Sequence, residues 1–316
     1  MPFETSPSSL ARIIELSAEE RPILVATGGR PNADTAMIAA AFLAGRNREA
    51  VHVFSVVENV LVPCRTCHQA AETAAAQGHT AEVCKARRAV QNELILRRTA
   101  VETQIGLTVG ETARWPIQVH AGTLSDITRS VVADTRAQVL VIGQSRQRSL
   151  VSPPGECAPT EQLTHTSIPV YIAAPTLRGL ARRVVVAMDF SEISVRAAQL
   201  AMRCSAADAS VYLIHVLPHA AVSELETRRH QLQHVARILQ TETDFHVEPV
   251  LLLGAAAPET LGFAGGIGAD LIACGAYSPP AYPTTRPVPP ALGRVARELI
   301  RRVPCSLLIA PEMAVE

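Results

Sequence analysis

The sequence predicts an α/β fold with two tandem Rossmann-like open parallel sheets and flanking helices. Short continuous apolar runs, which are typical of strands covered on both faces, alternate along the chain with segments of helical periodicity. The order of these elements in the first half is repeated in the second half. Strands and helices in alternation are joined by right-handed crossovers and form a parallel sheet, so we expect two such units in one chain.

Length and composition fit a folded protein of two domains. The chain has 316 residues, a hydrophobic content of 48% and a mean hydropathy of +0.18. A large core can be buried, and extensive disorder is not expected. With 29 basic and 29 acidic residues the formal net charge is zero, so nothing indicates a nucleic acid or an anionic membrane as a partner.

The apolar runs and the cysteines predict a cytoplasmic protein. No apolar run reaches the roughly 18 residues that span a bilayer, and the first residues lack the charged and apolar regions of a signal peptide. The seven cysteines are an odd number in a chain large enough to fold without disulfide bonds. We therefore expect free thiols in a reducing compartment.

The first half is expected to form a domain at residues 22–176, after an N-terminal extension at 1–21 with a short amphipathic pattern. Its strands are predicted from β-branched apolar runs bounded by polar residues. A cysteine-containing insertion at about 61–113, helix-prone in its second half, separates the second strand from the third. The predicted strands are 23–27, 51–57, 117–120, 139–143 and 170–173, with helices through Met37 and Leu43 and at 125–133.

The second domain, expected at residues 183–316, opens on the most informative stretch of the chain. The apolar run 184–188 leads into Asp189 and Ser191, and helical periodicity follows at once. Asp189 should therefore lie at the carboxyl end of a central strand, where open α/β sheets bind ligands. The remaining predicted strands, each matched by one in the first half, are 211–217, 247–253, 271–275 and 306–310.

The second half resembles the universal stress protein family along almost its whole length. The motifs that carry the resemblance, in family order, are 184–194, Arg196-Ala197-Ala198, His215-Val216-Leu217-Pro218, 269–275, 293–296 and 301–309. The first half is similar to the family more weakly, through 23–43, 137–143 and 166–175. The chain thus resembles a tandem universal stress protein with two family domains, which implies two adenine nucleotide alpha hydrolase-like sheets.

The resemblance also implies how a nucleotide would be held. Nucleotide-binding members of the family hold ATP with an Asp after the first strand, an apolar contact at the end of the second, and Gly-x2-Gly-x9-Gly-Ser/Thr after the fourth. Glycines let backbone N–H groups approach phosphates, a hydroxyl adds a donor, and the following helix presents its positive end.

In the second half, the resemblance implies one degenerate ATP site. Asp189, Val216 and Gly275 match the family, while Ser278 stands at the second glycine and a proline-rich stretch longer than the family spacing follows it. Gly293 matches the third glycine, and Arg294 replaces the hydroxyl residue but can still meet a phosphate as a charged fork. With Ser191 as the expected helix cap, the candidate cofactor-binding residues are Asp189, Ser191, Val216, Gly275, Ser278, Gly293 and Arg294.

The first half is expected to bind no ATP. Gly28 occupies the position of the Asp, Gly143 is kept, and Arg146 stands at the second glycine. Glu156 lies in the region of the third glycine, where its carboxylate would repel a triphosphate.

Asp189 of the second half also has a purely structural interpretation, because an acidic residue at this place often caps a helix. The capping role and the nucleotide-binding role are compatible.

The insertion carries a second candidate site. Cys64, Cys67, His79 and Cys84 offer three thiolates and an imidazole, a ligand set that suits tetrahedral zinc. A redox-active or merely solvated thiol pair at Cys64 and Cys67 is an open alternative. Cys64 to His68 also has the spacing of c-type haem attachment, but that chemistry requires export and an axial ligand.

The remaining histidines and one glycine-rich stretch do not predict a binding site. His230 and His234 share one face of a predicted helix among polar residues, which favours a solvated surface over a metal site. His215 should line the core or the crevice. Glycines 262–268 precede a strand instead of following one, which indicates a loosened helix end and not a phosphate loop.

The sequence therefore predicts a stress-response binding or regulatory protein and no enzyme, although weak ATP hydrolysis stays open. No nucleophile elbow and no Walker motif is present. The alternative is an interaction module that responds to zinc or redox state through residues 64–84. The two halves are expected to pair through their last strands, 170–173 and 306–310, as an intrachain pseudo-dimer, and a homodimer is possible.

Overall fold

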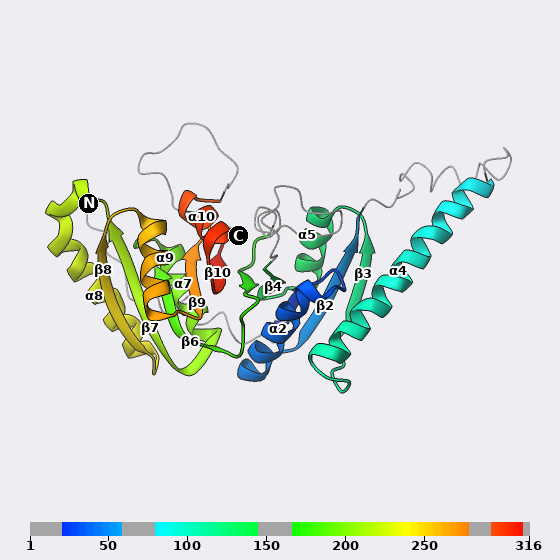
Figure 1. The fold of residues 1–316 in the computed structure, drawn as a ribbon, viewed down its shortest axis with the longest axis horizontal. Coiled ribbons are helices and arrows are strands. Elements are labelled where there is room, and N and C mark those ends of the chain that lie inside the picture. Colours follow the sequence, from blue (N-terminus) through cyan, green and yellow to red (C-terminus); the bar gives the residue numbers. More distant parts are fainter. Residues whose placement is uncertain (1–20, 59–79, 145–165, 278–291, 312–316) are drawn as a thin grey trace.

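The computed structural model describes residues 21–58, 80–144, 166–277 and 292–311. Ten strands of this part of the chain form one sheet with helices on both faces (Figure 1). The strands of the first half are β1 (Ile23–Ala26), β2 (Val51–Val57), β3 (Ile117–Ala121), β4 (Val139–Gly143) and β5 (Val170–Ala173). Those of the second half are β6 (Ala181–Ala187), β7 (Ser205–Leu217), β8 (His246–Leu253), β9 (Leu271–Gly275) and β10 (Ser306–Ala310).

The order of the strands is symmetric about the centre of the sheet, with one half of the chain on each side. It runs β3-β2-β1-β4-β5-β10-β9-β6-β7-β8, so each half has its third strand at the outer edge and its fifth at the centre. Neighbours within a half are parallel. The predicted repeat of a parallel α/β unit is confirmed.

The two halves meet through β5 and β10, which pair antiparallel. The register places Leu307 opposite Ile172, Leu308 opposite Tyr171 and Ile309 opposite Val170. The amide of Ala174 also donates to Ser306 Oγ across the join, at 3.2 Å. The expected pairing of the last strands is confirmed, and it buries two sheet edges that would otherwise be exposed.

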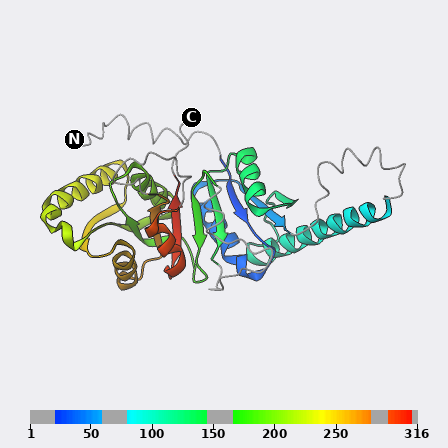
Figure 2. The same ribbon diagram turned by 90° about the horizontal axis from the view of Figure 1, so that it is seen from above.

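Helices cover the sheet in two layers, seen edge-on in Figure 2. One core lies between the sheet and α2 (Asp34–Asn47), α4 (Thr80–Thr108), α7 (Glu192–Arg203) and α8 (Leu225–Glu242). The other lies between the opposite face and α5 (Leu124–Thr135), α9 (Ala256–Ile267) and α10 (Arg294–Arg302). Both cores contain residues of both halves, so the hydrophobic interior continues across the join.

Three strands begin earlier than predicted: β6 at Ala181, β7 at Ser205 and β8, by one residue, at His246. The exposed Arg182 and Arg183 hide the start of β6 in the sequence, because they interrupt its apolar run. The backbone amides of both arginines donate to Asp270 Oδ2 at 3.0 Å, and the register shifts between Ala181 and Arg183. The predicted glycine-rich helix end is α9 itself, which ends where Gly268 adopts a φ of 62°.

Candidate functional site

The carboxyl ends of β6 and β9 form the candidate site of the second half. These strands are parallel neighbours, with Val186 opposite Ala273. β6 is followed by α7 and β9 is followed, after the segment at 278–291, by α10. Since β6 also pairs with β7 on its other side, the strand order reverses here, and such a switch point is where open α/β sheets bind ligands.

Asp189 lies at this edge, exposed to solvent. Its Oδ1 accepts hydrogen bonds from the Ser191 amide at 3.0 Å and from Ser191 Oγ at 2.5 Å. Ser191 is the N-cap of α7, and its Oγ accepts from the Ser194 amide at 3.2 Å. The cap predicted at Ser191 is therefore present, and Asp189 accepts hydrogen bonds from Ser191 at the carboxyl edge of the sheet.

Gly275 and Gly293 are brought together although 17 residues separate them. The amide of Gly293 donates to the carbonyl of Ala276 at 2.8 Å, and the amide of Ala276 donates to Ala310 at 2.7 Å. These bonds hold the start of α10 beside the end of β9. The two glycines that match the family motif thus lie at one edge with Asp189.

Gly275 also has a packing reason to be glycine. A Cβ at this position would lie 2.9 Å from Ile193 Cγ2, closer than carbon atoms pack. Gly275 therefore allows the first turn of α7 to approach the end of β9. This reason is compatible with a role of its backbone at a phosphate.

Phe190, His215 and Arg228 form a stack beside Asp189. Phe190 has a φ of 66°, which is strained for a bulky residue, and its ring centroid lies 4.6 Å from that of His215. The Arg228 guanidinium carbon lies 5.7 Å from the Phe190 ring centroid, within the range of a cation–π contact. Burial lowers the pKa of His215, whose Nδ1 donates to the Met188 carbonyl at 2.8 Å, so the ring is neutral near pH 7.

Val216 follows His215 but faces the other side of the sheet. Its neighbours along β7 alternate between the two cores, and Val216 packs with Ile214 and Leu252 against the face covered by α9 and α10. His215 packs on the face covered by α7 and α8. The sequence placed both residues at the end of β7, and only the structure separates their faces.

The matching edge of the first half is filled by protein. The registers of β1 with β4 and of β6 with β9 make Gly28 the counterpart of Asp189 and Gly29 the counterpart of Phe190. Gly29 has a φ of 69°, like Phe190, but a Cβ there would lie 3.1 Å from the Cβ of Ala100 on α4. In this half, α4 packs directly on the end of β1.

Gln104 of α4 holds this filled edge together. Its side chain is 6% exposed, and Nε2 donates to the Arg30 carbonyl and to Asp34 Oδ1, both at 2.7 Å. Its Oε1 accepts from Thr27 Oγ1 at 2.7 Å. No sequence pattern indicates this role, because a single buried glutamine on a helix cannot be distinguished by sequence from a solvated one.

Several predicted residues lie outside the described part of the chain. These residues are Ser278, Cys64, Cys67 and His79, together with Arg146 and Glu156 of the first half. Cys84 lies in α4, but its side chain is not described. Among the described residues no group of three or more metal-ligating side chains occurs. His230 and His234 are exposed on α8, as predicted.

The described cysteines are free, buried thiols. Burial raises the pKa of Cys204, Cys274 and Cys305 to about 12 each, and Asp189 adds to the effect on Cys274. Thiols with such a high pKa are unreactive near pH 7, because the thiolate is the nucleophile.

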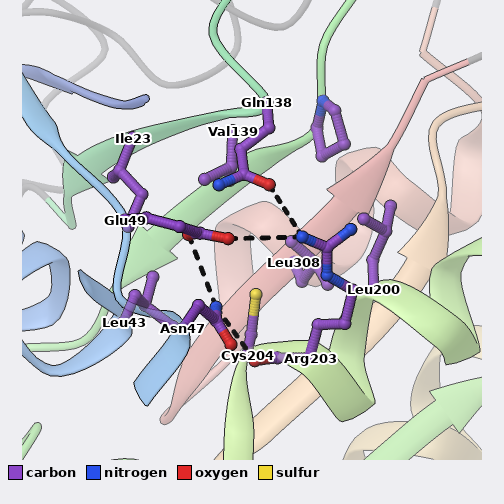
Figure 3. Close-up of a pocket in the computed structure, with 11 residues that line it drawn as sticks. Ile23, Leu43, Asn47, Glu49, Gln138, Val139, Leu200, Arg203, Cys204 and Leu308 are labelled. Atoms are coloured by element: carbon purple, nitrogen blue, oxygen red, sulfur yellow. Dashed lines mark hydrogen bonds and ion pairs between the residues drawn. The ribbon is translucent and has the colours of Figure 1, made fainter. Parts of the chain in front are cut away.

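A small pocket lies between the halves at the opposite, amino-terminal edge (Figure 3). Arg203 of α7 points across it, and its Nη2 donates to Gln138 Oε1 at 2.9 Å and lies 3.3 Å from Glu49 Oε1. Asn47 Nδ2 donates to Glu49 Oε2 and to the Arg203 carbonyl, both at 3.4 Å. These polar groups pair with one another, so the pocket joins the halves and presents no site of its own.

Comparison with known proteins identifies the second half. Residues 181–311 match the model of the universal stress protein family. The second half is therefore similar to this family in sequence. A search of curated proteins gave no match. Among the described residues no helix is long and apolar enough to cross a membrane.

Two solved structures resemble the whole chain in fold. A universal stress protein from Archaeoglobus fulgidus is 17% identical, with a TM-score of 0.61 over 93% of this chain and 99% of the other. A functionally unknown protein from Pseudomonas aeruginosa is 14% identical, with a TM-score of 0.56 over 92% of each chain. The tandem arrangement of the universal stress protein fold is therefore shown for both halves.

Proposed function

We propose that this protein binds one adenine nucleotide, in its second half only, and acts as a stress-response binding or regulatory protein and not as an enzyme. The observation that carries the proposal is the meeting of Asp189, Gly275 and the start of α10 at one exposed edge of the sheet. Each of these positions matches the ATP-holding pattern that the family resemblance implies.

The proposed roles follow from the chemistry of the groups. The carboxylate of Asp189 accepts from a ribose hydroxyl or an adenine amino group, and Val216 offers an apolar contact. The backbone at Gly275 and the amino end of α10 bind the phosphates. Ser278, which lies between them in the sequence, would contribute a hydroxyl.

Arg294 supports an anion at this edge. It is the first residue of α10, and no acidic residue lies in the first turn of that helix. A cation at the positive end of a helix is unfavourable alone, and a bound phosphate reverses that effect. Arg294 is exposed, so its guanidinium can turn toward a phosphate.

The first test is titration calorimetry with ATP on the full chain and on Asp189→Asn. Asparagine keeps an oxygen that can accept from Ser191, so the cap of α7 survives while the charge is lost. Asp208→Asn is the matched control, since Asp208 is also exposed and forms a surface ion pair with Arg182. We expect Asp189→Asn to weaken ATP binding at least about tenfold and Asp208→Asn to leave it unchanged. Equal affinities would refute the proposal.

Weak ATP hydrolysis, and a zinc-binding or redox role of the cysteine-containing insertion, are predictions separate from nucleotide binding. Phosphate release from ATP that exceeds a buffer blank, and is lost in Asp189→Asn, would make the protein a weak ATPase. The described residues provide no support for a zinc-binding or redox role of residues 64–84. Elemental analysis of the purified chain decides whether Cys64, Cys67, His79 and Cys84 hold zinc, with one equivalent expected if they do.

A further inference from the structure

His215 contacts the residue on each side of Asp189. Its Nδ1 lies 2.8 Å from the carbonyl oxygen of Met188, and since a carbonyl can only accept, Nδ1 carries the proton of this hydrogen bond. Its ring centroid lies 4.6 Å from that of Phe190, with the two ring planes tilted by 46°. Met188 and Phe190 directly precede and follow Asp189 in the chain. One side chain of β7 therefore holds both neighbours of the aspartate at the end of β6.

The backbone conformation of Phe190 determines how Asp189 meets Ser191. Phe190 has a φ of 66°, and the turn that it makes brings the Ser191 amide to 3.0 Å from Asp189 Oδ1. An extended Phe190 would carry this amide away from the carboxylate, because the amide follows Phe190 directly. The left-handed conformation is sterically unfavourable for a residue with a Cβ, above all for a bulky one. It therefore persists only where other contacts hold it.

The ring of Phe190 makes contacts that can hold this conformation. It is half-buried, and it contacts His215 and also Arg228, whose guanidinium carbon lies 5.7 Å from the ring centroid. Arg228 is fixed in turn by Glu224, since its Nε and Nη2 donate to Glu224 Oε2 at 3.0 and 2.7 Å. An aromatic pair and a cation–π contact together stabilise by an amount comparable to the steric cost of one left-handed residue. The stack therefore offsets the strain at Phe190.

The first half has neither the aspartate nor the stack. The registers of β1 with β2 and of β6 with β7 make Ser55 the counterpart of His215. The counterpart of Phe190 is Gly29, which has a φ of 69° and needs no ring to hold it there. The phenylalanine and the histidine thus occur together, in the half that keeps the aspartate.

We propose that His215 is a positioning residue of the nucleotide site, which fixes Asp189 for binding through the Met188 carbonyl and the Phe190 ring. This role rests on the proposed binding of a nucleotide by Asp189. His215 packs on the face covered by α7 and α8, opposite Val216, so it acts through Asp189 and not by contact with the ligand. A carboxylate that is already in place binds more tightly, because no ordering cost is incurred on binding.

Three variants separate the two contacts of His215. Asparagine keeps a donor for the Met188 carbonyl without an aromatic ring, phenylalanine keeps a ring without a donor, and leucine keeps neither. In titration calorimetry, His215→Leu is expected to weaken ATP binding about tenfold, and His215→Asn and His215→Phe are expected to restore part of the affinity. Equal affinity of His215→Leu and the natural chain, or equal losses in all three variants, would overturn the inference.

Tyr212→Leu is the matched control for a loss of stability. Tyr212 also lies on β7 and forms an aromatic pair, with its ring centroid 5.7 Å from that of Phe263, but on the opposite face of the sheet. Its loss should lower the melting temperature, as the loss of the His215 ring does, and leave the ATP affinity unchanged. If Tyr212→Leu weakened ATP binding as much as His215→Leu, a general loss of stability would explain both effects and refute the positioning role.

Hydrogen exchange of the nucleotide-free chain tests the positioning without ATP. The Ser191 amide donates to Asp189 Oδ1, so its exchange rate, measured by NMR, reports whether the carboxylate is in place. His215→Leu should speed up this exchange severalfold, and Tyr212→Leu should not. A natural chain that binds no ATP would refute the proposed function, while the exchange at Ser191 would still decide the role of His215. Unchanged exchange in His215→Leu overturns that role.

Discussion

Tyr171 and Leu308 are equivalent residues of the two halves, and they stand opposite each other in the antiparallel pair of β5 and β10. The registers of β4 with β5 and of β9 with β10 align Ala173 with Ala310, which makes Tyr171 the counterpart of Leu308. The pseudo-two-fold axis of the chain therefore passes between these two side chains. Both are buried, at 2% and 0% exposure.

Leu308→Ala should destabilise the whole chain, because both cores continue across this join. Loss of a fully buried leucine costs about 2–5 kcal/mol of unfolding free energy. Urea denaturation followed by circular dichroism is expected to show a lower midpoint and one transition for both halves. Leu253→Ala, at a side chain 38% exposed, is the control and should cost far less. Two separate transitions in the natural chain would contradict a shared core.

Gln104→Leu should destabilise the first half, since it removes the partner of the buried Thr27 hydroxyl and of two part-buried groups, the Arg30 carbonyl and the Asp34 carboxylate. Each buried group left without a partner costs about 1–3 kcal/mol. Gln91→Leu on the exposed surface of the same helix is the control. The stoichiometry of ATP binding should not change in Gln104→Leu, because the proposed single site lies in the second half. A gain of a second ATP would show that Gln104 alone blocks a working site.

Alkaline pH should destabilise the protein through its buried thiols. Burial raises the pKa of Cys204 and of Cys274 to about 12, whereas an unfolded thiol ionises near pH 8.5. Between these values the unfolded chain has released a proton that the folded chain retains, so stability is complete below about pH 8.5 and falls as the pH rises. The unfolding free energy measured from about pH 8 to about pH 11 should fall less steeply in Cys204→Ala than in the natural chain. Parallel pH profiles would contradict the assignment.

Two arginines in left-handed conformation offer a gain in stability. Arg48 and Arg136 end α2 and α5 with φ values of 58° and 49°. Glycine adopts this conformation without a steric cost, so Arg48→Gly and Arg136→Gly should each raise the unfolding free energy by about 1 kcal/mol. Arg129→Gly, inside α5, should lower it by a similar amount. Thermal melts distinguish these outcomes, and a loss of stability in Arg136→Gly would contradict the conformational argument.

The strands could be predicted because most of them are buried on both faces and appear as unbroken apolar runs. The residues 51–57, 139–143, 170–173, 271–275 and 306–310 form strands with the predicted bounds. The first part of β7, from Ser205, was missed because alanine, aspartate and serine there give no apolar run. Its place in the sheet comes from pairing with β6, which the sequence of β7 does not encode locally.

The candidate site was predictable only in its motif residues. Asp189, Gly275 and Gly293 follow from the family pattern, and the structure brings them to one edge. Phe190 and Arg228 were not recognised, since neither a positive φ nor a contact between residues far apart in the chain leaves a pattern in the sequence. The same holds for Gln104, whose role depends on where α4 packs.

The number of ATP molecules bound per chain at saturation tests the central claim most directly, namely that only one of two structurally equivalent edges binds nucleotide. Equilibrium dialysis with labelled ATP is expected to give one molecule per chain for the natural sequence and none for Asp189→Asn under the same conditions. Two molecules per chain, or one that persists in Asp189→Asn, would contradict the account.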